Sequence, residues 1–222
     1  MTRPVPQAPR SAPTLSFRAL ALALALPVVL SGCGAVSAIG SATEALEIYE
    51  LTAPDELPVR QGAPLSREVI IEVPSTSGAL DTDRIMVRPA PLQAQYLPDI
   101  RWSEDAPVML QTLMLRALDQ TAAFQYVGRR PLGSGGDFAI VTELVDFQAE
   151  LGAEGTAPVV QVRMVSRIVR ESGVQIVAAR TFAASERAAS LDDADIAAAF
   201  DAAAGRVISD FTLWTLTNLG AR

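Results

Sequence analysis

The chain of 222 residues carries 18 basic residues, all of them arginine, and 25 acidic residues, which give a net charge of −7. Such an acidic chain is a poor candidate for nucleic-acid binding, because that binding depends on neutralising phosphates. The absence of histidine excludes a Ser-His-Asp triad, a Cys-His pair and an imidazole metal site. Carboxylate chemistry stays open, either in a glycosidase or at an oxygen-ligand calcium site.

The first 32 residues have the pattern of a secretory signal peptide. Residues 1–18 contain three arginines and no acidic residue, and an apolar run follows from Ala19 to Leu30. A basic stretch, a short apolar core and small residues at the cleavage site are typical of export signals. The apolar run is about a dozen residues, whereas a membrane-spanning helix needs roughly 20. We therefore expect residues 1–32 to direct export and to be removed.

The segment Leu30-Ser31-Gly32-Cys33 resembles the lipobox of bacterial lipoproteins. The alternative is cleavage by the ordinary signal peptidase, with Cys33 incidental. Because Cys33 is the single cysteine and occupies the lipobox position, we predict lipidation at Cys33, a lipidated tether over 33–45 and one domain over 46–222. Cleavage before Cys33 leaves 15 arginines against 25 acidic residues, a net charge of −10. Anionic headgroups would repel that body, so membrane attachment must come from the acyl chains.

The first half of the domain is predicted to hold four short strands and one helix. The strands are expected at 48–51, 68–73, 84–88 and 93–97, separated by proline-containing loops. The helix is expected from 104 to 121. Ser103 would cap it, acidic residues suit its positive end, and Pro107 is tolerated in a first turn.

The second half is predicted to hold a short strand at 124–127, three long strands and a helix. The long strands are expected at 137–151, 158–170 and 174–184, and their short glycine-containing links predict antiparallel hairpins. Ser190-x-x-Asp193 resembles a capping box that opens the final helix. Apolar residues then recur at spacings of three and four: Ile196, Phe200, Ala203, Val207, Phe211 and Trp214.

This order of elements predicts an α+β fold. We expect a single two-layer domain, in which a mostly antiparallel or mixed sheet carries two helices on one face. In the strand at 158–170, Gln161, Arg163 and Arg167 alternate with apolar residues and are predicted to face solvent.

Several patterns resemble ligand sites but have simpler structural explanations. The run 133–136 is glycine-rich, but it opens a strand and has no lysine, so a plain turn is favoured over a phosphate loop. Asp81-Thr82-Asp83 lacks the other oxygen ligands of a calcium loop. The acidic residues Asp192, Asp193 and Asp195 suit a helix start, and Arg129-Arg130 suits a solvated loop. We therefore predict no catalytic residue, no metal and no cofactor.

Four residues before the first helix are candidates for binding a partner: Tyr96, Leu97, Arg101 and Trp102. We expect them in a loop between the sheet and the helix. Trp, Tyr and Arg are enriched at binding hot spots. The alternative is that the aromatic side chains close the end of the core.

The chain resembles a family, the auxiliary lipoproteins of ABC-type transport systems (PqiC-like). The resemblance rests on the lipobox at Cys33 and on the following segments: Tyr49-Glu50-Leu51, Arg84 to Pro89, Tyr96-Leu97, and Arg101-Trp102-Ser103-Glu104 leading through Pro107 into a leucine-rich helix. It covers roughly residues 46–218. The family often has an extra hairpin between the Tyr-Leu and Arg-Trp elements. Here only Pro98-Asp99-Ile100 separates them.

The resemblance implies a non-enzymatic subunit. Such lipoproteins act with an MCE (mammalian-cell-entry) domain protein, a permease and an ATPase that move lipid across the envelope, and some form rings, so a homo-oligomer is expected. Gly34 is not the aspartate that commonly retains lipoproteins at the inner membrane, which favours the periplasmic face of the outer membrane. Two alternatives stay open. One is a structural lipoprotein of another outer-membrane assembly, and the other is a carboxylate-based hydrolase.

Overall fold

In the part of the chain that the structure describes, one mixed sheet of eight strands and two helices make up the fold. The computed structural model describes residues 46–133, 135–153 and 156–221. The predicted signal peptide, the tether and Cys33 lie outside the described residues. The elements are β1 (Glu47–Tyr49), β2 (Leu65–Ile71), β3 (Arg84–Arg88), β4 (Gln95–Trp102), α3 (Ala106–Gln120), β5 (Phe124–Gly128), β6 (Phe138–Glu150), β7 (Val159–Arg170), β8 (Gln175–Arg187) and α4 (Asp193–Asn218).

The three long strands form the antiparallel part of the sheet. β6 pairs with β7 along almost its whole length, and β7 pairs with β8 in the same way, so the predicted hairpins are confirmed. Alternation explains why these strands form. On β7 the residues Val160, Val162, Met164 and Ile168 are buried, while Arg163 is exposed and Gln161 and Arg167 are half-buried.

The rest of the sheet adds parallel pairs, which no periodicity in the sequence indicated. β2 lies between β5 and β6 and runs parallel to both, and β3 also runs parallel to β6. β4 then pairs antiparallel with β3, and the short β1 runs parallel to the end of β4. The observed sheet is therefore mixed. The sequence allowed either a mixed or a mostly antiparallel sheet, and the mixed form is the one observed.

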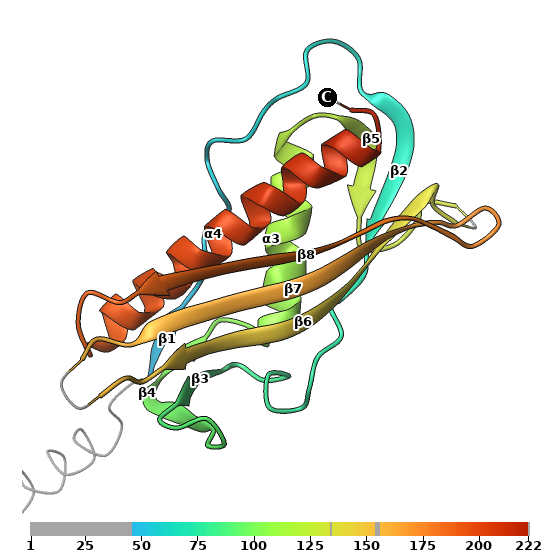
Figure 1. Cartoon of the computed structure of the whole chain (residues 1–222). Helices are drawn as coiled ribbons and strands as arrows, with labels where there is room; N and C mark the ends of the chain where they lie inside the picture. Colours follow the sequence, from blue (N-terminus) through green and yellow to red (C-terminus); the bar gives the residue numbers. More distant parts are fainter. Residues whose placement is uncertain (1–45, 134, 154–155, 222) are drawn as a thin grey trace, which may run out of the picture. The chain divides into compact units, whose positions relative to one another are not determined.

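Both helices lie on the same side of the curled sheet, with α4 crossing α3 (Figure 1). The predicted stripe along α4 is confirmed, since all its members are at most 8 % exposed: Ile196, Phe200, Ala203, Val207, Phe211 and Trp214. α3 buries Met109, Leu113 and Ala117 in the same core. The predicted two-layer α+β fold with two helices on one face is thus confirmed.

The predicted helix caps are wrong in detail. α3 begins after Asp105 instead of Ser103, and α4 begins after Asp192 instead of Ser190, and neither N-cap residue makes a side-chain capping bond. The backbone N–H of Ser103 instead donates to the carbonyl oxygen of Tyr49, which ties β4 to β1. The hydroxyl of Ser190 accepts from the N–H of Asp192 at 2.9 Å. Both serines therefore shape the turns that precede the helices.

Fully buried polar side chains have partners, whereas Oε2 of the half-buried Glu68 has none among the described residues. The amide of Gln111 donates to the carbonyl oxygen of Ile71 at 2.7 Å, which ties α3 to β2. The buried hydroxyls of Thr142 and Ser166 are 2.9 Å apart across the β6–β7 pair. Such pairing offsets the cost of burying polar groups.

The chain enters the domain at β1 and is fastened directly afterwards. The N–H of Thr52 donates to one carboxylate oxygen of Asp201 on α4 at 2.7 Å, and its hydroxyl lies 3.0 Å from both carboxylate oxygens. Leu51, the preceding residue, is 2 % exposed. The first core contact after β1 is thus held by a cluster of hydrogen bonds to the long helix.

Candidate functional site

The four residues predicted to bind a partner lie in a strand, not in a loop. β4 runs through all of them, from Gln95 to Trp102, so the expectation of a loop is wrong. A large register shift between the Met86–Tyr96 and Arg84–Arg101 pairs lets the intervening residues bulge from β3. The sequence did not indicate this strand, because Pro98 and Asp99 are poor strand residues except at an edge or a bulge.

Trp102 belongs to the core. It is 2 % exposed and packs against Phe147 of β6 and Phe200 of α4, with ring centroids 5.6 and 5.2 Å away. The rings of Phe147 and Phe200 are themselves 4.9 Å apart. Trp102 is therefore not available as a surface contact, and for this residue the core-closing alternative describes the structure.

Tyr96, Leu97 and Arg101 remain partly accessible. The hydroxyl of Tyr96 donates to the carbonyl oxygen of Ala79 at 3.0 Å, and the guanidinium carbon of Arg84 lies 3.9 Å from its ring centroid. Leu97 packs against the edge of the core. The side chain of Arg101 is 25 % exposed and lies 3.9 Å from Asp83. The surface of β4 therefore presents one aromatic ring, stacked on by Arg84 of β3, and the partly exposed Arg101 at its far end.

A cluster of acidic side chains surrounds the place where β1 meets the start of α4. The hydroxyl of Tyr49 donates to the carboxylate of Glu47 at 2.8 Å, and this bond raises the pKa of Tyr49 above its ordinary 10.0. Burial raises the pKa of Asp193 above its ordinary 3.8, and the negative charges of Asp99, Glu47 and Asp192 raise it further. Only the three-residue pairing of β1 with β4 brings Glu47 and Asp99 to this place, which the sequence did not reveal.

The raised pKa of Asp193 predicts that ionisation of this carboxyl lowers the stability of the folded domain as the pH rises. Just above pH 3.8 the folded state binds more protons at this carboxyl than the unfolded state, so its contribution to stability falls as the pH rises. The free energy of unfolding of Asp193→Asn relative to the wild type should therefore rise as the pH rises from about 4 to 7. Urea unfolding across this pH range measures it, with Asp210→Asn, an exposed acid on the same helix, as the control. A difference independent of pH would contradict the assignment.

The other patterns have structural roles. A Cβ on Gly136 would lie 2.7 Å from Cγ1 of Ile70, so this glycine permits close packing of the chain before β6 on β2. Asp83 contacts Arg101, and Arg129 donates to the hydroxyl of Thr112 at 2.6 Å. Within the described ranges, no three acidic or cysteine side chains come close enough together to hold a metal ion.

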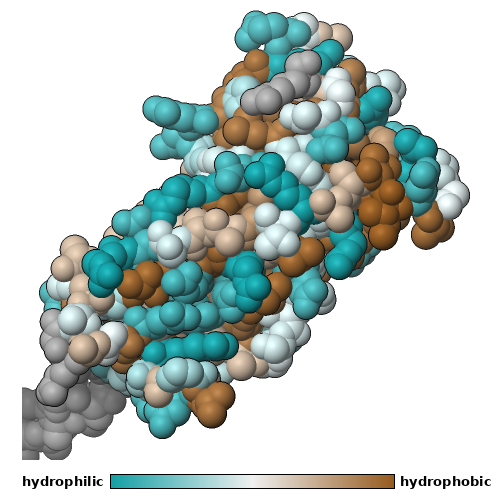
Figure 2. Space-filling view, in the orientation of Figure 1, coloured by the Kyte–Doolittle hydropathy of each residue, from teal (hydrophilic) through white to brown (hydrophobic). Residues whose placement is uncertain are grey.

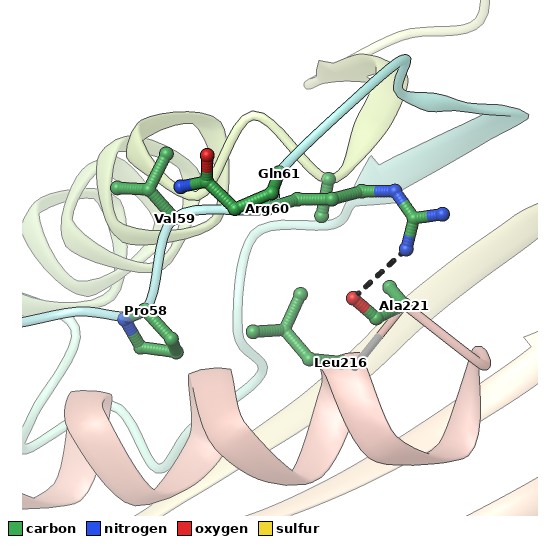
Figure 3. A pocket seen from close by; sticks show the side chains of 7 residues that line it. Pro58, Val59, Arg60, Gln61, Leu216 and Ala221 are labelled. Atoms are coloured by element: carbon green, nitrogen blue, oxygen red, sulfur yellow. Dashed lines mark hydrogen bonds between the residues drawn. The ribbon is translucent and has the colours of Figure 1, made fainter.

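The hollows of the described domain differ in the charged residues that line them. A cavity of about 330 Å³ lies between the loop that holds Arg60 and the end of α4, and Arg60 is the one charged residue in its lining (Figure 3). Arg60 donates to the carbonyl oxygen of Ala221 at 3.2 Å across this cavity. A second hollow, of about 360 Å³, is lined by Arg88 and Glu150. A third, of about 220 Å³, includes Glu50 and Asp201. Arg116 and Thr52 respectively already contact these two carboxylates.

Neither helix in the described part of the chain has the length and apolarity needed to cross a membrane. Residues 49–210 match the family described as ABC-type transport auxiliary lipoprotein component. The match includes every described strand except the first two residues of β1, and it reaches into the second half of α4.

The chain is also similar to three other proteins in sequence or fold. A Xanthomonas campestris protein of the DUF330 family has a similar crystal structure, with a TM-score of 0.69, 25 % identity, and coverage of 78 % of this chain and 96 % of its own. An uncharacterized protein of known structure shares the fold at a TM-score of 0.59 and 13 % identity, covering 78 % of this chain and 99 % of its own. An uncharacterized Bradyrhizobium diazoefficiens protein is 25 % identical over 169 residues, which are 76 % of this chain and 44 % of that protein. The chain thus spans less than half the length of this relative.

Proposed function

Because this chain belongs to the family of ABC-type transport auxiliary lipoprotein components, we propose that it is a non-catalytic, lipid-anchored subunit of an envelope lipid transport system. Its partners would be an MCE-domain protein and, through it, a permease and an ATPase. The anchor would be Cys33, and Gly34 after it favours the periplasmic face of the outer membrane. Membership of the family supports an envelope-associated component of a transport system.

The main support for a binding role is the free edge of the sheet at β8. Both helices cover one face, and within the described residues β8 pairs only with β7. This edge strand is 13 residues long and has no proline. Long open edges are ready templates for pairing with another chain. A second copy or the MCE-domain protein would find unpaired backbone groups there, which supports assembly into a homo-oligomer such as a ring.

The β4 surface is the second support for a partner contact. Tyr96 and Arg101 stay accessible while Trp102 anchors the strand from inside the core. Accessible Tyr and Arg side chains on a rigid strand match the composition of binding hot spots. The proposed contact therefore includes Tyr96, Leu97 and Arg101, and it excludes Trp102.

The double substitution Tyr96→Ala with Arg101→Ala tests this contact. We expect less MCE-domain protein in a pull-down from detergent-solubilised envelopes, or a lower oligomer mass, because both side chains would leave the interface. The free energy of unfolding should fall by only roughly 1 kcal/mol, since the stacking and the ion pair that are lost are near the surface.

Leu92→Ala is the matched control, because Leu92 is fully exposed in the turn before β4. It should leave both binding and stability unchanged. Unchanged binding by the folded double variant would remove β4 from the interface. A wild-type protein that stays monomeric at all concentrations and ignores the MCE-domain protein would refute the proposed partnership itself.

A further inference from the structure

Exposed aliphatic side chains gather where the β7–β8 hairpin and the loop after β5 project from the domain. Val174 is 83 % exposed, Leu132 70 % and Ile176 58 %. The backbone N–H of Glu171 in the hairpin donates to the carbonyl oxygen of Asp137 at the end of the loop, so hairpin and loop lie side by side. Figure 2 shows apolar surface at this end of the domain, bordered by hydrophilic side chains. We call Leu132, Val174, Ile176 and Val177, with Arg130 and Arg170, the hairpin tip.

Val174 is unusual in its backbone as well as in its exposure. Its φ is 48°, directly after Gly173 with a φ of 89°, so two successive residues adopt the left-handed region. A β-branched residue is a genuine outlier there, whereas glycine or asparagine would fit without strain. Folding of the hairpin therefore does not explain a valine at this position. A strained, exposed aliphatic side chain points to a contact made outside the domain.

Arginines flank these aliphatic side chains. Arg130 is exposed in the loop, and Arg170 ends β7 with its guanidinium carbon 5.9 Å from the ring centroid of Phe138. Among the described residues, neither arginine lies within 4.0 Å of a carboxylate. The neighbouring carboxylate of Asp137 is engaged by the N–H of Glu68 at 2.8 Å. Arg170 also donates to the side-chain oxygen of Gln175 at 3.3 Å, and Glu171 follows it in the turn. The hairpin tip thus presents two arginines with one carboxylate of the hairpin beside them.

From this geometry we propose that the hairpin tip inserts into the headgroup region of a phospholipid bilayer that contains anionic lipid. The aliphatic residues at the end of a projecting hairpin can insert into a deformable lipid surface. The guanidinium groups of the arginines can form bidentate hydrogen bonds with lipid phosphates. This contact is additional to acylation at Cys33 and does not depend on the MCE-domain partner.

The test uses the full-length lipoprotein in vesicles. Once Cys33 is acylated it has no free thiol, so Ser172→Cys gives a unique labelling site in the hairpin that keeps Val174 and Ile176. The fluorescence of a bimane label at position 172 is measured in vesicles of phosphatidylethanolamine and phosphatidylglycerol that contain brominated phospholipids as quenchers. The control label is at Leu92→Cys, in the fully exposed turn before β4.

We expect roughly two-fold stronger quenching at position 172 than at position 92. Arg130→Gln with Arg170→Gln should weaken the contact about five-fold for each arginine lost, and so should replacing anionic lipid by phosphatidylcholine. Val174→Asn with Ile176→Ser should reduce quenching to the level at position 92. Equal quenching at the two positions would overturn the proposal, as would protection of position 172 by added MCE-domain protein alone. Failure of the anchor is distinguishable, because the protein would then not float with the vesicles.

Discussion

Replacing Cys33 with alanine is expected to release the protein from the membrane. The variant lacks the thiol that takes up a diacylglycerol, and each methylene buried in the bilayer contributes about 0.8 kcal/mol. Two chains of ordinary length therefore supply far more binding energy than one hairpin contact. Fractionation of cells that express the variant should place it away from the membrane pellet, while the wild-type protein sediments with it.

Gly34→Ala is the matched control for this experiment. It changes the neighbouring residue without removing the thiol, so the variant should remain membrane-bound. Mass spectrometry of the purified wild-type protein should show an acylated cysteine at the N-terminus. An unmodified N-terminus at another position, or a Cys33→Ala protein that sediments with membranes as before, would refute lipidation as the anchor.

Trp102→Ala is expected to destabilise the domain by roughly 3–5 kcal/mol, because truncating a buried aromatic side chain removes its apolar contacts and leaves a cavity. The tryptophan joins β4 to β6 and α4 through the rings of Phe147 and Phe200. A loss of that size is a large part of the total stability of a typical domain. Denaturant unfolding, followed by circular dichroism, measures it.

Trp102→Phe and Leu92→Ala complete the series. The first keeps an aromatic ring in the cluster and should cost less than the alanine variant, and the second removes a fully exposed side chain and should cost nothing. An alanine variant as stable as the wild type would mean that Trp102 is not packed in solution. It would then return to the set of candidate partner contacts.

The sequence predicted the element order well because periodicity is a local signal. The stripe along α4 and the alternation along β7 are readable from neighbouring residues, and both are buried as expected. The parallel pairs of β2 with β5 and β6 are not readable in this way, since they join segments more than 50 residues apart in the chain. The inclusion of β1 rests on a similarly distant pair, because Glu47 of β1 lies opposite Ile100 of β4.

The candidate site was predicted only in part for a related reason. Tyr96 and Trp102 share one short segment, and composition alone cannot say which aromatic side chain points inward. Pro98 suggested a loop, but the register shift between β3 and β4 accommodates it within a strand. The hairpin tip was overlooked because Gly173 and its neighbours look like an ordinary turn. The left-handed backbone of Val174 appears only in the folded chain.

The attachment of β1 has a mechanical consequence. A pull on the chain before Leu46 loads the three-residue pairing of β1 with β4, including the core contact of Tyr49, before it reaches the buried Leu51. Detachment of β1 from β4 would free residues 47–50 and lengthen the tether by up to about 14 Å. The hydrogen bonds between Thr52 and Asp201, next to the buried Leu51, then resist further extraction. Under tension on the tether, β1 can therefore detach from β4 first, while the hydrogen bonds between Thr52 and Asp201 keep Leu51 in the core.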